Sequence, residues 1–119
     1  MKYIRRENYL DRLIELKDKP IIKAIVGIRR CGKSTLLMMY RDYLISAGIN
    51  ENDIVMMNFT HSPFSEMTAE NILKEIRSSG AKYVLFDEIQ MIESWDKMVI
   101  TLFEELGCDI YITGSNSVM

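Results

Sequence analysis

The feature that most constrains this chain is a pair of glycines, Gly27 and Gly32, with a lysine and a hydroxyl residue directly after the second glycine. The segment before them, IIKAIVG at 21–27, is apolar and rich in β-branched residues, which predicts a strand. The segment after them, KSTLLMMYRDYLISAG at 33–48, has the apolar spacing of a helix. A strand that leads into a helix through a short glycine-rich loop is typical of proteins with a parallel sheet.

The loop between that strand and that helix has the composition of a phosphate-binding loop. Gly27, Gly32, Lys33 and Ser34 fit the pattern G-x-x-x-x-G-K-[ST]. A polyphosphate needs backbone N–H groups turned toward it, and glycines allow that curvature and the close approach. The start of the following helix adds free N–H groups and the positive end of its dipole. We therefore predict a nucleotide-phosphate site lined by Gly27, Ile28, Arg29, Arg30, Cys31, Gly32, Lys33, Ser34 and Thr35.

The side chains of this loop have separate expected roles. Lys33 supplies a point charge for the β- and γ-phosphates, and Ser34 offers a hydroxyl to Mg²⁺. Thr35 contacts the α-phosphate or packs locally. For Arg29 and Arg30 two alternatives stay open, because arginine suits phosphate binding and variable loop positions also face solvent.

The rest of the chain alternates strands and helices in the same way. Apolar periodicity predicts the helices 5–17, 33–48, 69–79 and 94–106 and the strands 21–27, 53–59, 82–88 and 109–115. This alternation predicts one α/β domain over residues 1–119, a three-layer α/β/α fold with a parallel sheet of about four strands. The share of hydrophobic residues, 48%, is that of a globular domain with one core.

Polar side chains follow two of the predicted strands at the point where each strand ends. Ligands of parallel sheets bind beyond these carboxyl ends. Asp87 is expected to hold Mg²⁺ through water beside the ion bound by Ser34, and Glu88 to orient the attacking water. Ser115 and Asn116, with Thr113 behind them, are expected to reach the γ-phosphate or that water, and a simple polar turn is the alternative. The predicted catalytic residues are thus Glu88, Lys33, Ser115 and Asn116, and the predicted metal residues are Ser34 and Asp87.

Charge and cysteine content argue against several other classes of protein. The formal net charge of −2 gives no overall field that favours nucleic acid or a membrane. DNA binding through Lys2, Arg5, Arg6 and Arg12 stays a weaker alternative. Cys31, Cys108 and His61 lack the spacing of metal ligands or of a disulfide framework. The cytoplasm is therefore the expected compartment, and with no apolar run of about 18 residues no membrane span is expected.

Three segments together resemble a known family. GIRRCGKSTLL, LFDEIQMIESWDKMV and DIYITGSNSVM are similar to the corresponding segments of bacterial and archaeal AAA-type ATPases of the AAA_14 kind, which are often fused to a DUF4143 region. The resemblance implies a P-loop NTPase fold with an additional strand and the sheet order 5-1-4-3-2. It also implies that Lys33, Ser34, Asp87 and Glu88 take the nucleotide roles given above and that the segment TGSNS is a sensor.

The resemblance has one departure, at the end of the chain. Members of that family continue with a fifth strand, a helical lid and a C-terminal region, so this chain is expected to be the N-terminal part of a longer protein. Strand one would then form a sheet edge, and an exposed apolar edge invites pairing with another chain. We expect a homo-oligomer through that edge. Elution as a monomer at high protein concentration would contradict this expectation.

The expected function is ATP binding and Mg²⁺-dependent ATP hydrolysis. Turnover by the isolated chain is expected to be slow, because no arginine finger can be assigned in the sequence. ATP is favoured over GTP because the sequence has no N-K-x-D motif. The alternative is a nucleotide-gated module in which ATP reshapes the loops 60–68 and 89–94 and a protein client, not identified by the sequence, reads the change. A small-molecule kinase is disfavoured, because no arginine-rich lid segment is present.

Overall fold

Four parallel strands and four helices make up the fold. The computed structural model describes the backbone of residues 6–26 and 32–114, and the side chains in those ranges from Tyr9 onward. The elements, in chain order, are α1 (Arg6–Glu15), β1 (Lys23–Ile25), α2 (Lys33–Ser46), β2 (Ile54–Asn58), α3 (Ala69–Ser79), β3 (Tyr83–Asp87), α4 (Trp95–Glu104) and β4 (Asp109–Thr113). Short 3₁₀ turns at Glu51–Asp53, Phe64–Glu66 and Ile89–Met91 join them. Every predicted helix and strand is present, with ends within two residues of the prediction.

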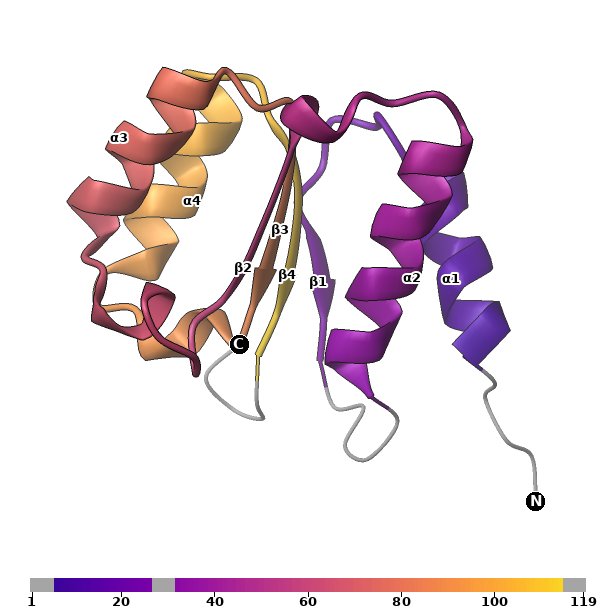
Figure 1. Cartoon of the computed structure of the whole chain (residues 1–119), viewed down its shortest axis with the longest axis horizontal. Helices are drawn as coiled ribbons and strands as arrows, with labels where there is room; N and C mark the ends of the chain where they lie inside the picture. The colour runs from indigo at the N-terminus through magenta and orange to yellow at the C-terminus, as the bar shows by residue number, and fades with distance from the viewer. Residues whose placement is uncertain (1–5, 27–31, 115–119) are drawn as a thin grey trace.

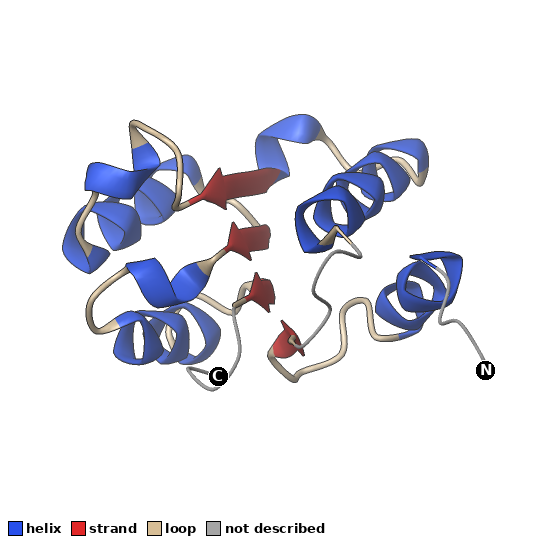
Figure 2. Ribbon diagram, turned by 90° about the horizontal axis from the view of Figure 1, so that it is seen from below, coloured by secondary structure: helices blue, strands red, loops and turns tan. Residues whose placement is uncertain are grey.

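The sheet has the strand order β1-β4-β3-β2, and all three neighbouring pairs are parallel. Helices α1 and α2 cover one face, and α3 and α4 cover the other (Figure 1). The view along the strands in Figure 2 shows the row of strands between the two helical layers. This confirms the predicted three-layer α/β/α architecture. The order also agrees with the last four positions of the order 5-1-4-3-2 that the family resemblance implies.

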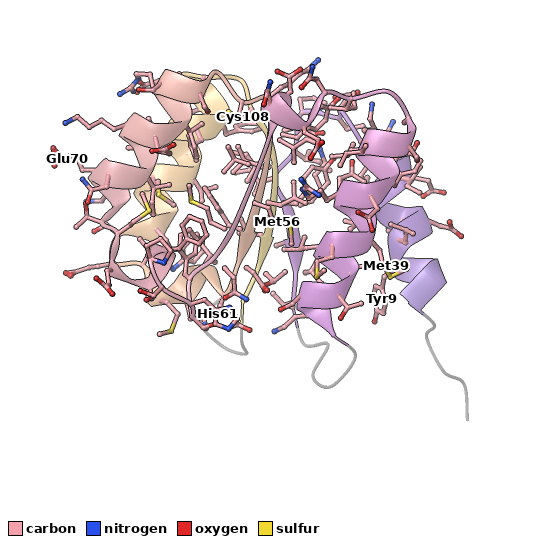
Figure 3. The ribbon with its side chains drawn as sticks, in the orientation of Figure 1. Tyr9, Met39, Met56, His61, Glu70 and Cys108 are labelled. Carbon is pink, nitrogen blue, oxygen red and sulfur yellow. The ribbon has the colours of Figure 1, made fainter. Side chains whose placement is uncertain are left out.

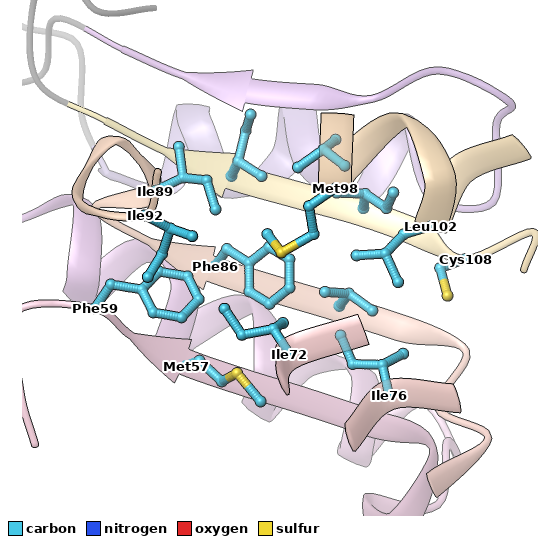
Figure 4. Packing of buried hydrophobic residues seen from close by; sticks show 14 of the residues in the cluster. Met57, Phe59, Ile72, Ile76, Phe86, Ile89, Ile92, Met98, Leu102 and Cys108 are labelled. Atoms are coloured by element: carbon cyan, nitrogen blue, oxygen red, sulfur yellow. The ribbon is translucent and has the colours of Figure 1, made fainter. Parts of the chain in front are cut away.

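The two central strands are apolar on both faces because both faces are covered. All five residues of β3 and all five of β4 are buried. A continuous apolar run of this kind is typical of strands inside a parallel sheet. On the face of α3 and α4, Phe59 and Phe86 pack with their ring centroids 5.2 Å apart. Figure 4 shows this core, which also includes Met57, Ile72, Ile76, Ile89, Ile92, Met98 and Leu102.

A buried ion pair ties β1 to β4 on the other face of the sheet. Lys23 Nζ lies 2.5 Å from Asp109 Oδ1, and the side chains are only 1% and 6% exposed. Lys23 Nζ also donates to the carbonyl of Lys19 at 2.7 Å. Asp109 Oδ2 accepts hydrogen bonds from Tyr111 Oη at 2.7 Å and from the backbone N–H of Asp18 at 2.8 Å. Both charges are therefore paired and hydrogen-bonded, as burial requires.

Two tyrosines extend this network into α2. The hydroxyls of Tyr40 and Tyr111 lie 2.5 Å apart, and both side chains are fully buried. Burial is the main cause that raises the pKa of both phenols, and the Asp109 charge raises it further. Both phenols therefore stay neutral, and that of Tyr111 donates to the carboxylate. This contact fixes α2 against β4, and α2 begins with the predicted Lys33 and Ser34.

Strand β1 forms one edge of the sheet that the structure describes. It pairs with β4 alone, and Ile21 and Val26 beside it are 48% and 45% exposed. A groove of about 340 Å³ runs along this edge, lined by α1, β1 and Leu36. The predicted pairing with a second copy of the chain stays a prediction. Within the described ranges, no helix combines the length and the apolar character needed to cross a lipid bilayer.

Candidate functional site

The carboxyl ends of the strands and the start of α2 meet at one edge of the molecule (Figure 1). Helix α2 begins at Lys33 directly after Gly32, whose φ of 72° lies in the left-handed region. Glycine adopts this conformation at little cost, because it has no Cβ. The turn directs the first backbone N–H groups of α2 toward the edge where β3 and β4 end.

Lys33 reaches the end of β4. Its ammonium donates a hydrogen bond to the carbonyl of Gly114 at 2.6 Å. Gly114 directly follows the last residue of β4, and the Lys33 side chain is half-buried. The contact places a positive charge beside the N-terminus of α2, so two sources of positive potential lie at the same place. Such an arrangement favours a bound anion.

Asp87 lies at the centre of the site and is only 1% exposed. The hydroxyl of Ser34, from the first turn of α2, donates to Asp87 Oδ2. The same oxygen accepts from Asn58 Nδ2, at the end of β2, at 3.2 Å. Thr113 Oγ1, at the end of β4, donates to the other oxygen, Oδ1, at 2.5 Å. Three elements thus hold one carboxylate, and the structure brings the predicted metal residues Ser34 and Asp87 into contact.

The Ser34 hydroxyl oxygen and the Asp87 carboxylate oxygen that it contacts suit a small divalent cation. Hard cations such as Mg²⁺ prefer oxygen ligands, and Mg²⁺ is usually bound by one or two protein groups plus substrate phosphates. Ser34 is exposed, whereas Asp87 is buried behind it. The Ser34 hydroxyl and the Asp87 carboxylate are the groups that would hold such a cation. The donor chemistry of the site fits Mg²⁺.

Glu88 follows Asp87 in an uncommon backbone conformation. Its φ of 57° lies in the left-handed region, which non-glycine residues adopt rarely. Its N–H donates to Thr113 Oγ1 at 3.0 Å, so one threonine hydroxyl contacts both acidic residues. Gln90 Nε2 donates to Glu88 Oε1 at 2.8 Å. The left-handed backbone at Glu88 thus follows the end of β3, and the Gln90 amide contacts the Glu88 carboxylate.

Two residues of the site were not predicted from the sequence, Asn58 and Gln90. Asn58 is the last residue of β2, in register with Asp87. Its Oδ1 accepts from the N–H and the hydroxyl of Thr60, so its side-chain orientation is fixed. The rule that selected Asp87, a polar residue ending an apolar strand, would have selected Asn58 too if the strand end had been placed one residue earlier.

Several predicted residues lie outside the described part of the chain. They are Gly27, Ile28, Arg29, Arg30 and Cys31 of the loop and Ser115 and Asn116 after β4. Thr35 is described and is half-buried. Of the basic residues considered for DNA binding, Lys2 and Arg5 are outside the described ranges, Arg6 is described by its backbone alone, and Arg12 is exposed.

His61 and Cys108 lie at opposite edges of the sheet (Figure 3). Figure 3 shows His61 at the carboxyl edge of the sheet and Cys108 near the opposite edge. Cys108 is buried, and its thiol donates to the carbonyl of Ala81 at 3.5 Å. Burial raises the pKa of this thiol, which keeps it protonated and poorly reactive.

Comparison with known proteins shows the family to which the chain belongs. Residues 19–119 match the family described as an AAA domain, AAA_14. An uncharacterized protein of Haemophilus influenzae is 45% identical over 120 residues, which cover 96% of this chain and 30% of that protein. An uncharacterized protein of Methanocaldococcus jannaschii is 33% identical over 123 residues, which cover 98% of this chain and 26% of the Methanocaldococcus protein. The chain thus spans less than a third of each of these relatives.

Proposed function

This chain belongs to the AAA domain family, and we propose that it binds ATP together with Mg²⁺. We propose further that it hydrolyses the bond between the β- and γ-phosphates of ATP. The observation that carries the proposal is the contact of the Ser34 hydroxyl with the buried Asp87 carboxylate at the start of α2. Lys33 lies at the same rim. A hydroxyl, a carboxylate and an ammonium group at a helix N-terminus are the groups that a nucleotide–Mg²⁺ complex needs.

The triphosphate would lie over the N-terminus of α2. The N–H groups of the first turn have no partner inside the helix and can donate to phosphate oxygens. The Lys33 ammonium is a compact charge on a flexible stem, so it can leave the Gly114 carbonyl for a phosphate at little cost. The loop residues Gly27, Ile28, Arg29, Arg30 and Cys31 would complete the proposed cradle, and Thr35 would contact the α-phosphate or pack locally.

The cation would be held by this chain's Ser34 and Asp87. When bound, Mg²⁺ neutralises the negative charge that develops on the transferred phosphoryl group. Ser34 would offer its hydroxyl to the cation, and Asp87 would supply the negative charge beside it. Asn58 and Thr113 keep the Asp87 carboxylate in one orientation while this happens, because both donate to it.

The attacking water would be oriented by Glu88. A carboxylate within hydrogen-bond reach of that water accepts its proton as the bond to phosphorus forms. The left-handed backbone at Glu88 means that its side chain does not continue the alternation of β3 after Asp87. We propose that the Asp87 carboxylate binds the cation and that the Glu88 carboxylate orients the water. Ser115 and Asn116, which follow β4, are proposed to contact the γ-phosphate or the water.

Replacing Asp87 with asparagine should make nucleotide binding much less dependent on Mg²⁺. The change keeps the shape of the side chain but removes the negative charge that the cation needs, so the Mg²⁺-dependent part of the affinity should fall by about tenfold or more. The measurement is equilibrium binding of a fluorescent ATP analogue with Mg²⁺ and with EDTA. Asp96→Asn, at an exposed position of α4, is the matched control and should behave as wild type. Equal Mg²⁺ dependence in Asp87→Asn and wild type would refute the metal role.

A further inference from the structure

We propose that Gln90 is a positioning residue that holds the carboxylate of Glu88 in place for the attack of water on the γ-phosphate. The inference rests on the hydrolysis proposed above and goes beyond it, since neither the loop pattern nor the family resemblance gives Gln90 a role. It is carried by one contact, Gln90 Nε2 to Glu88 Oε1 at 2.8 Å, and by the way in which the turn between the two residues is fixed.

The backbone between the two residues is held at both ends. The Glu88 N–H donates to Thr113 Oγ1 at 3.0 Å, and the Glu88 carbonyl accepts from the N–H of Met91 at 3.2 Å. Between them Ile89 is fully buried in the core of α3 and α4, as Figure 4 shows. An uncommon conformation such as that of Glu88 persists where the surroundings determine it in this way. The Cα positions of Glu88 and Gln90 are therefore set by the fold.

With the backbone fixed, the Glu88 side chain still has three rotatable bonds. The amide of Gln90 restricts that freedom, because it donates to one carboxylate oxygen from the adjoining 3₁₀ turn. The amide can face the carboxylate only with its nitrogen, since its oxygen would place two acceptors against each other. A side chain held ready in the reactive geometry loses less entropy when the water arrives.

The orientation of the Gln90 amide is set by the bond from its Nε2 to Glu88, and no partner of its Oε1 contributes within the described ranges. Gln90 Oε1 is buried, and it has no hydrogen-bond partner among the residues that the structure describes. Buried polar atoms are usually paired, and an exception asks for an explanation. Here the side chain keeps its donor on Glu88 while its acceptor goes unpaired within the described ranges. In the described part of the chain, the contact with Glu88 is therefore the hydrogen bond that orients the Gln90 amide.

The kinetic test is a double-mutant cycle between Gln90 and Glu88 under single-turnover conditions. Gln90→Met removes the donor and keeps the length of the side chain, and it should lower the hydrolysis rate by about 10- to 100-fold without weakening ATP binding. Gln90→Glu should lower the rate at least as much, because it places two carboxylates together. In the Glu88→Gln background, Gln90→Met should add no further loss, because the two residues act as one unit.

The outcomes separate this inference from the function on which it rests. If Glu88→Gln slows hydrolysis and Gln90→Met does not, the role of Gln90 is overturned and the proposed ATPase function stands. If neither change alters the rate, the role of Glu88 is contradicted and the inference fails with it, while the ATPase function stands. The proposed function itself fails only if the wild-type chain does not hydrolyse ATP. Weaker ATP binding by Gln90→Met, or a further rate loss on the Glu88→Gln background, would mark Gln90 as structural and overturn its positioning role.

A second measurement does not depend on activity. Gln90 is the only glutamine of the sequence, so the nuclear magnetic resonance signals of its side-chain amide can be assigned from a single substitution. In the wild-type chain these protons should be protected from solvent and shifted by the carboxylate. In Glu88→Ala they should move toward the position of an exposed amide. An amide signal that Glu88→Ala leaves unchanged would overturn the contact.

Discussion

Replacing Glu88 with glutamine should lower the single-turnover rate of ATP hydrolysis by about 10²- to 10⁴-fold, the range that a general base contributes. The amide has the size of the carboxylate but cannot accept the proton of the attacking water. ATP binding should not change, because the proposed phosphate contacts come from Lys33 and the start of α2. The measurement is hydrolysis of radiolabelled ATP by excess protein, with binding of the same nucleotide followed in parallel.

Glu93→Gln is the matched control for this experiment. Glu93 is an exposed carboxylate five positions further along the chain, beyond the 3₁₀ turn, and its replacement should leave the rate at the wild-type value. Hydrolysis by Glu88→Gln at the wild-type rate would contradict the role of Glu88. The same variant also tests the alternative function. A chain that retains ATP and traps a protein partner would favour the nucleotide-gated module.

Replacing Lys23 with methionine should reduce the free energy of unfolding by about 3 to 5 kcal/mol, because it leaves the buried Asp109 carboxylate without its cation. Methionine fills a similar volume, so the loss comes from the charge rather than from a cavity. For a domain of this size the change corresponds to a fall in the melting temperature of about 10 to 20 °C. Chemical denaturation followed by circular dichroism measures the free energy directly.

The surface ion pair of Arg41 and Glu51 provides the control. These two side chains are 34% and 68% exposed, and the atoms lie 3.1 Å apart. Because exposed pairs contribute less than about 1 kcal/mol, Arg41→Met should change the stability little. The double variant Lys23→Met with Asp109→Asn should regain part of the loss, since the unpaired charge is gone. Equal stability of Lys23→Met and wild type would show that the buried pair is unimportant.

The strand ends show how far the sequence predicts this site. An apolar run followed by two acidic residues predicted that Asp87 and Glu88 end a buried strand, and the glycine pattern predicted where α2 begins. These signals are local, so they can be read without the fold. The contact between Ser34 and Asp87 follows from them, because the carboxyl ends of parallel strands meet at one edge.

Other parts of the site depend on register and turn geometry, which the sequence does not display. Asn58 contacts Asp87 because the two residues are paired across β2 and β3. Gln90 reaches Glu88 because Glu88 has a left-handed backbone conformation. A glycine would have indicated such a conformation in the sequence, but this position is a glutamate. The predicted strand at 21–27 is shorter in the structure for a similar reason. Its Ile25 pairs with Thr113, the last residue of β4, so the ladder ends there.

The central claim is that one binding site for a nucleoside triphosphate and its cation is formed by the start of α2, Lys33 and the pair of Ser34 and Asp87. Titration calorimetry with ATP and Mg²⁺ tests it most directly, on the wild-type chain, on Lys33→Ala and on Lys74→Ala, an exposed lysine of α3. The account predicts saturable binding at a single site for wild type and for Lys74→Ala, and a loss of about 100-fold or more in affinity for Lys33→Ala, the scale of a buried charged contact. Equal heats for Lys33→Ala and wild type, or no binding to the wild-type chain, would contradict it.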